Sequence, residues 1–263
     1  MKTLLLVCGI FLAGTVFSEA SSIEDRNDEN AQRLYTRIYS RLGGRGEYAD
    51  IYDYIPDLFG SGFNDNIESV LQTGMWMYYE NNNYNVEYSG RVYFVHGIDL
   101  RVDFPSSFRN AASSIRYAGD RHNPNGNTWT LFDGEYFCGQ SFFGATDAYS
   151  LQYLDMKASS LVITGSSPWT IYSGQGYTGD NLCVYPTDHD TGSAGDYLDF
   201  GIYPTMSAIG IPDNTIRSVR QGCWSKKIAQ PPKIEYEERR ENGGWGYAHL
   251  PESLLRKSSG SQQ

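Results

Sequence analysis

The chain has 263 residues, with 31 acidic against 21 basic side chains and a net charge of −10. This acidic balance disfavours nucleic acid and anionic membranes as direct partners, because both select for basic patches. The 21 tyrosines and 28 glycines favour strands and turns over helices.

The first twenty residues have the features of a secretory signal peptide. Lys2 supplies a positive start, residues 4–17 are apolar, and Ala20 ends a plausible small-residue cleavage site. The apolar run is short for a membrane span, and no later segment approaches the needed length. We therefore expect a secreted protein without direct membrane insertion, with an uncleaved anchor as the alternative.

Four stretches of the chain repeat one pattern that ends in an aromatic residue. Three begin with tryptophan, at Trp76–Tyr79, Trp129–Phe132 and Trp169–Tyr172, and Thr36–Tyr39 is a weaker copy. Each unit closes with a serine and an apolar residue, and these serines are Ser69, Ser114, Ser160 and Ser218. A period of this size marks a repeated supersecondary unit.

Each unit has the residues of a folded-over hairpin. The opening tetrapeptide is rich in aromatic and β-branched residues, as a strand is, and a turn follows it. Gly139 and Gly179 supply a backbone position that a residue with Cβ occupies only at a cost. We expect the closing serine to hydrogen-bond the backbone of a nearby turn. Four antiparallel strands of this kind form a Greek key, and two such units form a β-sandwich.

The spacing of the units predicts two domains. The longest gap lies between Ser114 and Trp129 and contains Asn123-Pro-Asn-Gly126, which is a turn and linker signal. The units therefore pair as first with second and third with fourth. The expected division is a signal peptide at 1–20, a polar arm at 21–33, domains at 34–119 and 127–224, a linker at 120–126 and a disordered tail at 225–263.

The repeated pattern, aromatic-x4-aromatic-x-Gly with a later Asn/Asp-rich hexapeptide ending in Ser, resembles the βγ-crystallin family. Phe132–Gly139 and Tyr172–Gly179 match it fully. The first two units match it in part, because Val86 replaces the glycine of one and Gly44 replaces the second aromatic of the other. The resemblance covers most of the mature chain. It implies an all-β protein with two Greek-key β-sandwich domains, each built from two four-stranded motifs.

Many members of this family bind calcium through the hexapeptide [Asn/Asp]-[Asn/Asp]-x-x-[Ser/Thr]-Ser, and Ca²⁺ prefers such oxygen ligands. The four hexapeptides here are Asn64–Ser69, Arg109–Ser114, Asp155–Ser160 and Asp213–Ser218. None is a perfect match. Glu68 and Arg217 replace a hydroxyl ligand, and Arg109 and Met156 replace an oxygen ligand in the leading pair.

These losses leave one intact combination in each domain. In the swapped arrangement that the family suggests, a site takes its leading residues from one unit and its hydroxyl from the partner. The intact sites would then be Asn64, Asp65 and the Asn66 carbonyl with Ser113, and Asp213, Asn214 and the Thr215 carbonyl with Ser159. The other combination in each domain would place arginine at the ion, where its charge is repelled.

Two alternatives remain for the hexapeptides. If each site draws all its ligands from one hexapeptide, all four sites are damaged. The serines, Asn and Asp residues could also serve only the turns, for which their side chains are well suited. Calcium is therefore the one cofactor that we consider, with the low affinity of extracellular modules, about 10⁻⁴ to 10⁻³ M.

Three cysteines remain once Cys8 leaves with the signal peptide: Cys138, Cys183 and Cys223. The secretory route is oxidising, so we expect one intramolecular disulfide and one leftover thiol. The sequence does not fix the pairing, and we prefer Cys183 with Cys223 because both lie in the fourth unit. That unit also contains a long segment, Pro186–Pro212, which we interpret as a functional or mobile loop.

The sequence contains no recognisable catalytic motif, and we expect no enzyme activity. The first hypothesis is a secreted, non-catalytic protein with a structural or adhesive extracellular role. The alternative is a host-defence or recognition factor that binds a partner protein, a protease or a microbial surface. Some members and relatives of this family act as inhibitors or as components of membrane-active complexes. The expected partner is another extracellular protein or a second copy of the chain.

Overall fold

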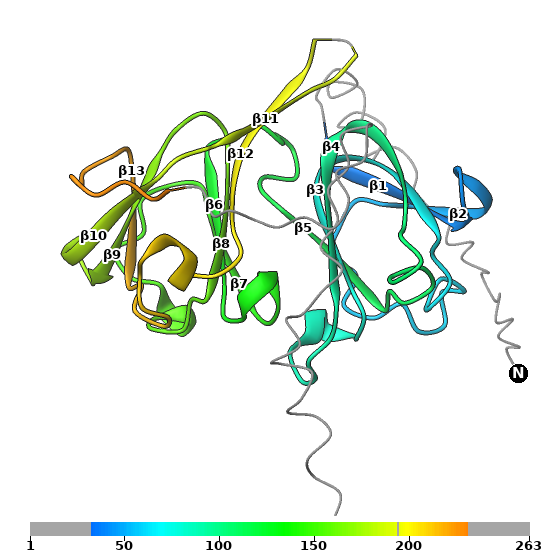
Figure 1. Ribbon diagram of the computed structural model, residues 1–263, viewed down its shortest axis with the longest axis horizontal. Coiled ribbons are helices and arrows are strands. Elements are labelled where there is room, and N and C mark those ends of the chain that lie inside the picture. Colours follow the sequence, from blue (N-terminus) through cyan, green and yellow to red (C-terminus); the bar gives the residue numbers. More distant parts are fainter. Residues whose placement is uncertain (1–32, 194, 231–263) are drawn as a thin grey trace, which may run out of the picture. The chain divides into compact units, whose positions relative to one another are not determined.

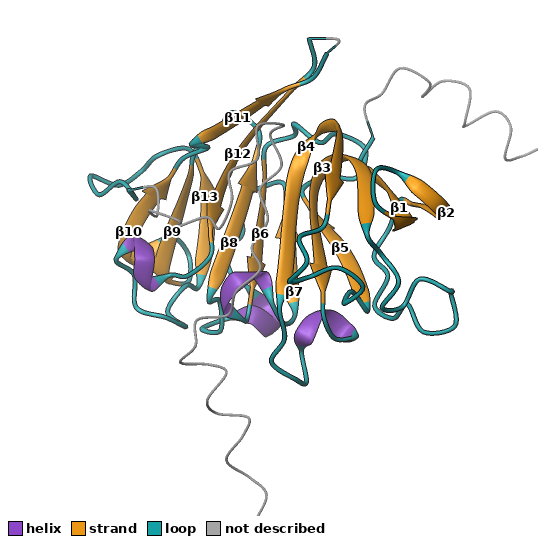
Figure 2. Cartoon of the chain, turned by 45° about the vertical axis from the view of Figure 1, so that its right-hand side comes forward, coloured by secondary structure: helices purple, strands orange, loops and turns teal. Residues whose placement is uncertain are grey.

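The computed structural model describes residues 33–193 and 195–230, which belong to one compact unit. Strands and loops dominate it, with a few short 3₁₀ helices (Figures 1 and 2). The first half contains β1 Tyr35–Arg41, β2 Arg45–Ile51, β3 Ser69–Tyr79, η2 Asn83–Asn85, β4 Val92–Asp103 and β5 Ser114–Ala118. The second half contains β6 Thr128–Phe132, η3 Glu135–Phe137, β7 Ser141–Gly144, η4 Gln152–Leu154, β8 Ser160–Thr164, β9 Trp169–Gly174, β10 Thr178–Val184, β11 Asp188–Thr191, β12 Tyr197–Tyr203, η5 Ser207–Ile209 and β13 Ser218–Gln221. The expected signal peptide and most of the expected tail lie outside the described residues.

In the first half, the two units exchange a strand. β3 begins as the last strand of the first unit, paired with β1, and continues past Gly74 as the first strand of the second unit, paired with β5. The end of β4, from the second unit, pairs with the β3 segment of the first. In return, Ile55 of the first unit bridges Ile115 of the second. The two units therefore share both sheets of one sandwich.

The second half repeats this exchange. One sheet has the order β11-β12-β8-β6-β7 and the other has the order β10-β9-β13. β12, from the fourth unit, pairs with β8 of the third, and Ala148 of the third unit bridges Val219 of the fourth. Both halves are thus sandwiches made of two Greek-key units, as the sequence predicts.

The four closing serines make the same pair of hydrogen bonds. Each hydroxyl donates to a carbonyl in the first turn of a unit, over 2.6–2.7 Å, and accepts a backbone N–H three residues further on, over 3.0–3.1 Å. The carbonyls belong to Arg41, Asn81, Gly134 and Gly174, and the N–H groups to Gly44, Tyr84, Phe137 and Tyr177. The predicted serine ties are confirmed, and they hold each hairpin folded over its sheet.

The glycines of the motif take the backbone conformation that the sequence predicts. Gly139 and Gly179 have φ of +80° and +78°, and a Cβ at Gly139 would lie 1.9 Å from the Asp133 carboxylate. The second unit, where Val86 stands at this position, folds differently. Val86 has φ −64°, and the preceding residue Asn85 has φ +60°, whereas its counterpart Cys138 in the third unit has φ −77°.

Each half has its own apolar core, and a third cluster joins them. Trp76 belongs to the first core, Trp129 and Trp169 to the second, and all three are at most 1% exposed. The joining cluster combines residues such as Met77 and Phe94 with Phe137 and Phe200. The Tyr79 hydroxyl also donates to the Phe137 carbonyl over 2.6 Å. The two halves are therefore packed together, which the spacing of the units does not predict.

The interpretation of Pro186–Pro212 as a loop is wrong. Most of this segment forms the β11–β12 hairpin and η5, and the hairpin extends from its sheet (Figure 1). β12 is a central strand because Leu198, Phe200 and Ile202 alternate along it and are buried. The surplus over the other units is thus β11 and the turn that joins it to β12.

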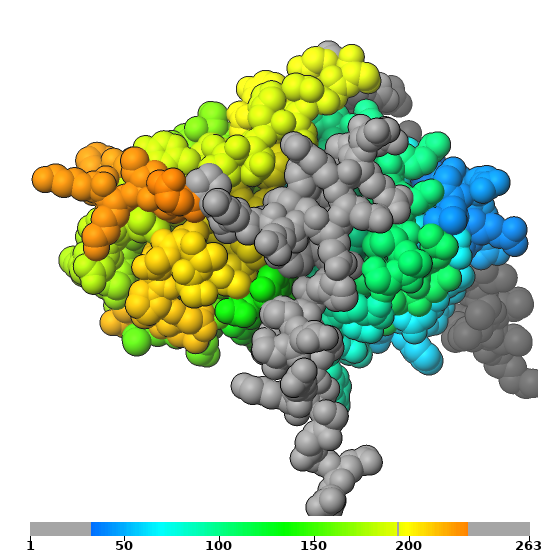
Figure 3. Space-filling model, in the orientation of Figure 1, coloured from blue at the N-terminus to red at the C-terminus, as the bar shows by residue number. Residues whose placement is uncertain are grey.

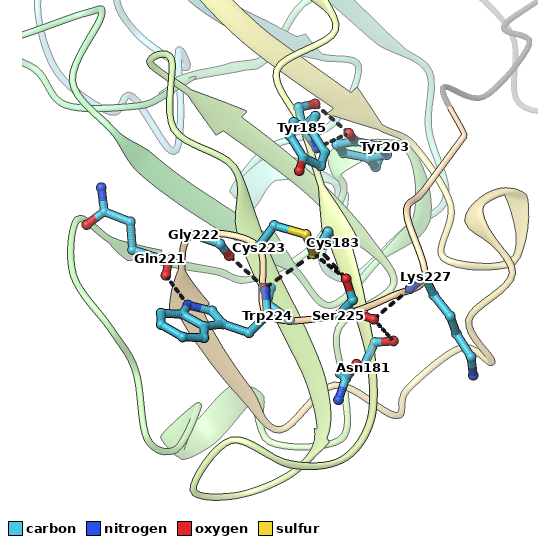
Figure 4. Close-up of a disulfide and its surroundings, with 11 residues drawn as sticks. Asn181, Cys183, Tyr185, Tyr203, Gln221, Gly222, Cys223, Trp224, Ser225 and Lys227 are labelled. Atoms are coloured by element: carbon cyan, nitrogen blue, oxygen red, sulfur yellow. Dashed lines mark hydrogen bonds between the residues drawn. A yellow bond between two sulfur atoms is a disulfide. The ribbon is translucent and has the colours of Figure 1, made fainter.

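The preferred disulfide is present. Cys183 on β10 is bonded to Cys223, which follows β13 (Figure 4). Cys138 is free. The chain then runs along β10, where Lys227 and Ala229 hydrogen-bond the backbone of Cys183. Residues 225–230, expected to open a disordered tail, are therefore ordered along the edge of β10, which they cover against pairing with other chains.

Candidate metal sites at the paired hexapeptides

The hexapeptides of paired units lie against each other and exchange backbone hydrogen bonds. The second residue of each has left-handed backbone, with φ between +52° and +60°: Asp65, Asn110, Met156 and Asn214. The N–H of each donates across to the partner hexapeptide, as from Asp65 to Ala112 and from Asn214 to Ala158, over 2.9–3.2 Å. Asn and Asp tolerate this conformation better than most residues. The turn-only interpretation therefore accounts for part of the hexapeptide pattern.

The first predicted combination brings residues of two units together. The Asp65 carboxylate from the first unit lies 3.4 Å from the Ser113 hydroxyl of the second. Asn64 is beside them, because its amide donates to the other oxygen of the Asp65 carboxylate over 2.9 Å. The Asp65 carboxylate, the Asn64 amide group and the Ser113 hydroxyl thus lie together at the surface of the first domain.

In the second domain the two hexapeptides meet through their backbones, but the described residues show no contact between the Ser159 hydroxyl and Asp213 or Asn214. The Asn214 amide donates to Asp213 over 2.9 Å, as Asn64 does to Asp65. Ser159 is buried beside the Ala158 carbonyl that accepts the Asn214 N–H. The Thr215 hydroxyl is occupied by the Pro212 carbonyl over 2.7 Å, which leaves its own carbonyl as the oxygen of interest.

Sequence reasoning missed one residue of this second group, Glu135. It lies on η3, between the two aromatic residues of the third unit, and so belongs to the partner of Asp213 and Asn214. Partial burial, and then the nearby negative charge of Asp213, raise the pKa of the Glu135 carboxyl. Two carboxylates that repel each other favour a bound cation. The signal in the sequence was an acidic residue three positions after Phe132.

The remaining combination in the second domain holds an arginine, as predicted. Arg217 makes a forked ion pair with Asp155, with Nη2 2.7 Å from one carboxylate oxygen and Nε 3.0 Å from the other. Gln175 donates to the same carboxylate over 3.1 Å. These hydrogen bonds, with that from Arg217 the strongest influence, hold the pKa of Asp155 below its ordinary value. The Arg217 guanidinium thus takes the place that a metal ion would occupy.

In the first domain the corresponding combination differs from the prediction. Arg109 does not lie at the centre of the group, since its Nη2 donates to the Phe104 carbonyl over 3.3 Å. Instead the Asn110 amide donates to Glu68 over 3.2 Å, and Glu68 also accepts the Leu42 N–H over 3.1 Å. Both carboxylate oxygens of Glu68 therefore have donors. Glu68, which stands in place of the hydroxyl, thus has its carboxylate occupied by protein donors, a different arrangement from the ion pair in the second domain.

The donor sets of the two predicted combinations suit a hard cation. They consist of carboxylate, amide, hydroxyl and backbone carbonyl oxygens, the ligands that Ca²⁺ takes. Among residues 33–230 no three His, Cys, Asp or Glu side chains cluster as a transition-metal site would require. Within the same part of the chain, no helix has the length and apolarity to cross a membrane.

Solved structures provide the comparison for this architecture. Geodin, a βγ-crystallin from Geodia cydonium, aligns over 72% of this chain and 99% of its own, with a TM-score of 0.51 and 17% identity. The chain has the βγ-crystallin fold. At this identity the similarity to geodin shows the fold alone.

Two other βγ-crystallin-fold structures align less well. A βγ-crystallin from an archaeon is 28% identical over 37% of this chain and 99% of its own, with a TM-score of 0.30. Protein S complexed with calcium is 16% identical over 72% of this chain and 99% of its own, with a TM-score of 0.25. Comparison of the sequence with protein-family models and with curated proteins gives no match.

Proposed function

We propose that this chain is a secreted, non-catalytic βγ-crystallin-fold protein with a structural or adhesive extracellular role, and that it binds one Ca²⁺ weakly in each domain. The observation that carries the calcium proposal is the approach of Asp65 to Ser113 across two units. The tetrahedral cysteine and histidine sites of zinc have no counterpart among the described residues.

The first domain would hold Ca²⁺ between Asn64, Asp65, the Asn66 carbonyl and Ser113. The second would hold it between Asp213, Asn214, the Thr215 carbonyl and Ser159, with Glu135 as an additional carboxylate. A bound ion would stabilise the fold because it binds the native state alone, by about 1 kcal/mol when its concentration is a few times Kd. It would also relieve the repulsion between Glu135 and Asp213.

The disulfide supports the extracellular proposal. Cys183–Cys223 ties β10 to the segment after β13, and such bonds persist in oxidising compartments. The chain is acidic, and its two domains each have an apolar core and pack together through a shared apolar cluster. These features suit a stable structural protein of an extracellular fluid or matrix. The second copy of the chain or another extracellular protein remains the proposed partner.

Titration calorimetry of residues 21–263 with Ca²⁺ tests the calcium proposal. We expect heat from two sites, with Kd of about 10⁻⁴ to 10⁻³ M, and a higher melting temperature with Ca²⁺. Mg²⁺ at the same concentrations is the control and should give a smaller effect, because it dehydrates reluctantly. Absence of both heat and stabilisation would refute calcium binding.

The β11–β12 hairpin favours the second candidate function, a recognition factor in host defence. It is the part of the fourth unit that exceeds the other units, and His189 and Tyr197 stack near its tip with both side chains about half exposed. Since β12 is a core strand, a test must shorten only the turn between Thr191 and Tyr197. Loss of partner binding at an unchanged melting temperature would support this function, and full retention would remove its basis.

A further inference from the structure

The two domains fill the same part of their interiors with different kinds of side chain. In the second unit, Tyr78 on β3 faces Tyr93 on β4, and in the fourth unit Ile171 on β9 faces Leu182 on β10. The residue directly before the hexapeptide is Phe108 in the second unit and Pro212 in the fourth. These pairs occupy equivalent positions in their repeats.

A fourth pair follows from identical hydrogen bonds. The Phe104 N–H donates to the Glu68 carbonyl, and the Met206 N–H donates to the Ser159 carbonyl, each acceptor being the fifth hexapeptide residue of the partner unit. The first domain therefore has four aromatic rings where the second has Ile171, Leu182, Met206 and Pro212.

The four rings of the first domain interlock. Phe104 lies 5.0 Å from Tyr78, 4.9 Å from Tyr93 and 5.7 Å from Phe108, measured between ring centroids. Phe108 is fully buried among them. Its counterpart Pro212 is exposed instead, whereas the residues before the other two hexapeptides, Phe63 and Leu154, are buried. The fourth unit alone lacks this inward-facing side chain.

The second domain has a pocket of about 200 Å³ at this place. Ile171, Leu182 and Ile216 form its apolar floor, and Ile211 and Pro212 form one wall. In Figure 3 the gold segment that follows β12 lies on the surface beside β10. An engineered apolar cavity of about 150 Å³ binds benzene, so this volume is enough for one aromatic ring.

The rim of the pocket is polar. Asp180 and Lys227 lie on it, with the Lys227 ammonium 3.9 Å from the Asp180 carboxylate, and both side chains are mostly exposed. Ser173 and Thr215 add hydroxyl groups. An apolar floor with a few polar groups at the edge is the usual make-up of a small-molecule site.

We propose that this pocket binds a small molecule with a single aromatic ring and one hydrogen-bonding substituent. The ring would occupy the space that aromatic side chains fill in the first domain, and the substituent would lie at the rim near Asp180 and Lys227. The pocket shares Thr215 with the calcium proposal, but its floor of Ile171, Leu182 and Ile216 contributes no calcium ligand. Phenol binding and calcium binding can therefore be measured separately.

Phenol is the probe, titrated into residues 21–263 and followed by methyl NMR signals. Saturable shifts are expected at Ile171, Leu182 and Ile216, and none at Ile38 in the first domain. Leu182→Tyr, which introduces the residue type found at Tyr93, should weaken phenol at least tenfold and leave the fold intact. Ile228→Tyr adds the same ring outside the pocket and should leave the affinity unchanged.

Several outcomes of these experiments would contradict the proposal. If Leu182→Tyr does not fold, Ile171→Tyr fills the same space and replaces it. Phenol binding that survives both fillings would overturn the proposal, as would equal shifts at Ile38 and Leu182, which would indicate unspecific binding. A wild-type protein whose Ile171, Leu182 and Ile216 signals do not move up to the solubility of phenol would also overturn it.

Discussion

Arg217 and Asp155 form a forked ion pair between the hexapeptides of the fourth and third units. Asp155 leads its own hexapeptide, and Arg217 stands at the fifth position of the partner, where the family pattern has a hydroxyl. The pairing therefore shows directly that the leading residue of one hexapeptide meets the fifth residue of the other. In the first domain it is the second residue of the leading pair, Asp65, that meets the fifth residue of the partner hexapeptide, Ser113.

Removal of the arginine should create a third calcium site. Arg217→Ser frees the Asp155 carboxylate and supplies the missing hydroxyl, so the calorimetric stoichiometry should rise from two ions to three. Arg121→Ser removes the same charge from an ion pair with Asp53, outside the four hexapeptides, and should leave the stoichiometry at two. An unchanged stoichiometry in Arg217→Ser would show that Met156, beside Asp155, disables this place without help from the arginine.

Glu135 should link calcium binding to pH. Its pKa is raised by burial and by Asp213, so between its unfolded and folded pKa values the native state binds more protons than the unfolded state. This group therefore lowers the stability of the calcium-free protein as pH rises through that window. Glu135→Gln should raise the calcium-free melting temperature at pH 7, weaken calcium in the second domain about tenfold, about 1.4 kcal/mol, and flatten the pH dependence.

The control for this experiment is Asn82→Ala, at the equivalent position of the second unit. It removes no charge and should leave the pH dependence of stability unchanged. Denaturation curves from pH 4 to pH 8 without calcium measure the effect. A lower calcium-free stability in Glu135→Gln would contradict a repulsive contact with Asp213.

The serine ties should each contribute measurably to stability. Ser160→Ala leaves the Gly134 carbonyl and the Phe137 N–H without their partner, a loss of about 1–3 kcal/mol for buried groups. Ser106→Ala, at an exposed serine with no recorded hydrogen bond, should stay within about 0.5 kcal/mol of the wild type. Urea denaturation of both variants gives the comparison. Equal stabilities would mean that the turn holds without its serine.

The disulfide should stabilise the second domain through the unfolded state. Cys183 and Cys223 are separated by 40 residues, and closing a loop of that length is worth about 4 kcal/mol in the chain-entropy model. The double variant Cys183→Ser/Cys223→Ser should therefore melt at a lower temperature, whereas Cys138→Ser should melt close to the wild type. If the two melted alike, the bond would stabilise the native state far less than this model requires.

Much of the architecture could be predicted because residues within each repeat determine its local backbone structure. The aromatic pairs mark the hairpins, Gly139 and Gly179 mark left-handed backbone, and the closing serines mark the ties, so strand order and pairing of units follow. β11 could not be predicted, because Asp188–Thr191 has no apolar alternation and pairs only through its backbone with β12. β12 itself has the alternation of a strand, which the surrounding prolines and glycines obscured.

The metal sites were less predictable than the fold. The approach of Asp65 to Ser113 could be predicted because both positions are fixed relative to the repeat, and calcium binding there stays a prediction. Glu135 was missed because it reaches the group from a turn, and its place depends on which unit is its partner. The packing of the two halves also escaped prediction. Its one signal was β3, whose residues from Thr73 to Tyr79 are buried on both faces, which a strand with one solvent face would not need.

The claim that each calcium site is shared by two units is tested most directly by Ser113→Ala. This change leaves the hexapeptide Asn64–Ser69 intact and removes only the hydroxyl that the partner unit contributes. Titration calorimetry should show two calcium ions bound to the wild type and one to the variant, with Ser69, Ser114 and the serine ties undisturbed. Two ions bound to the variant with unchanged affinity, or none bound to the wild type, would contradict the account.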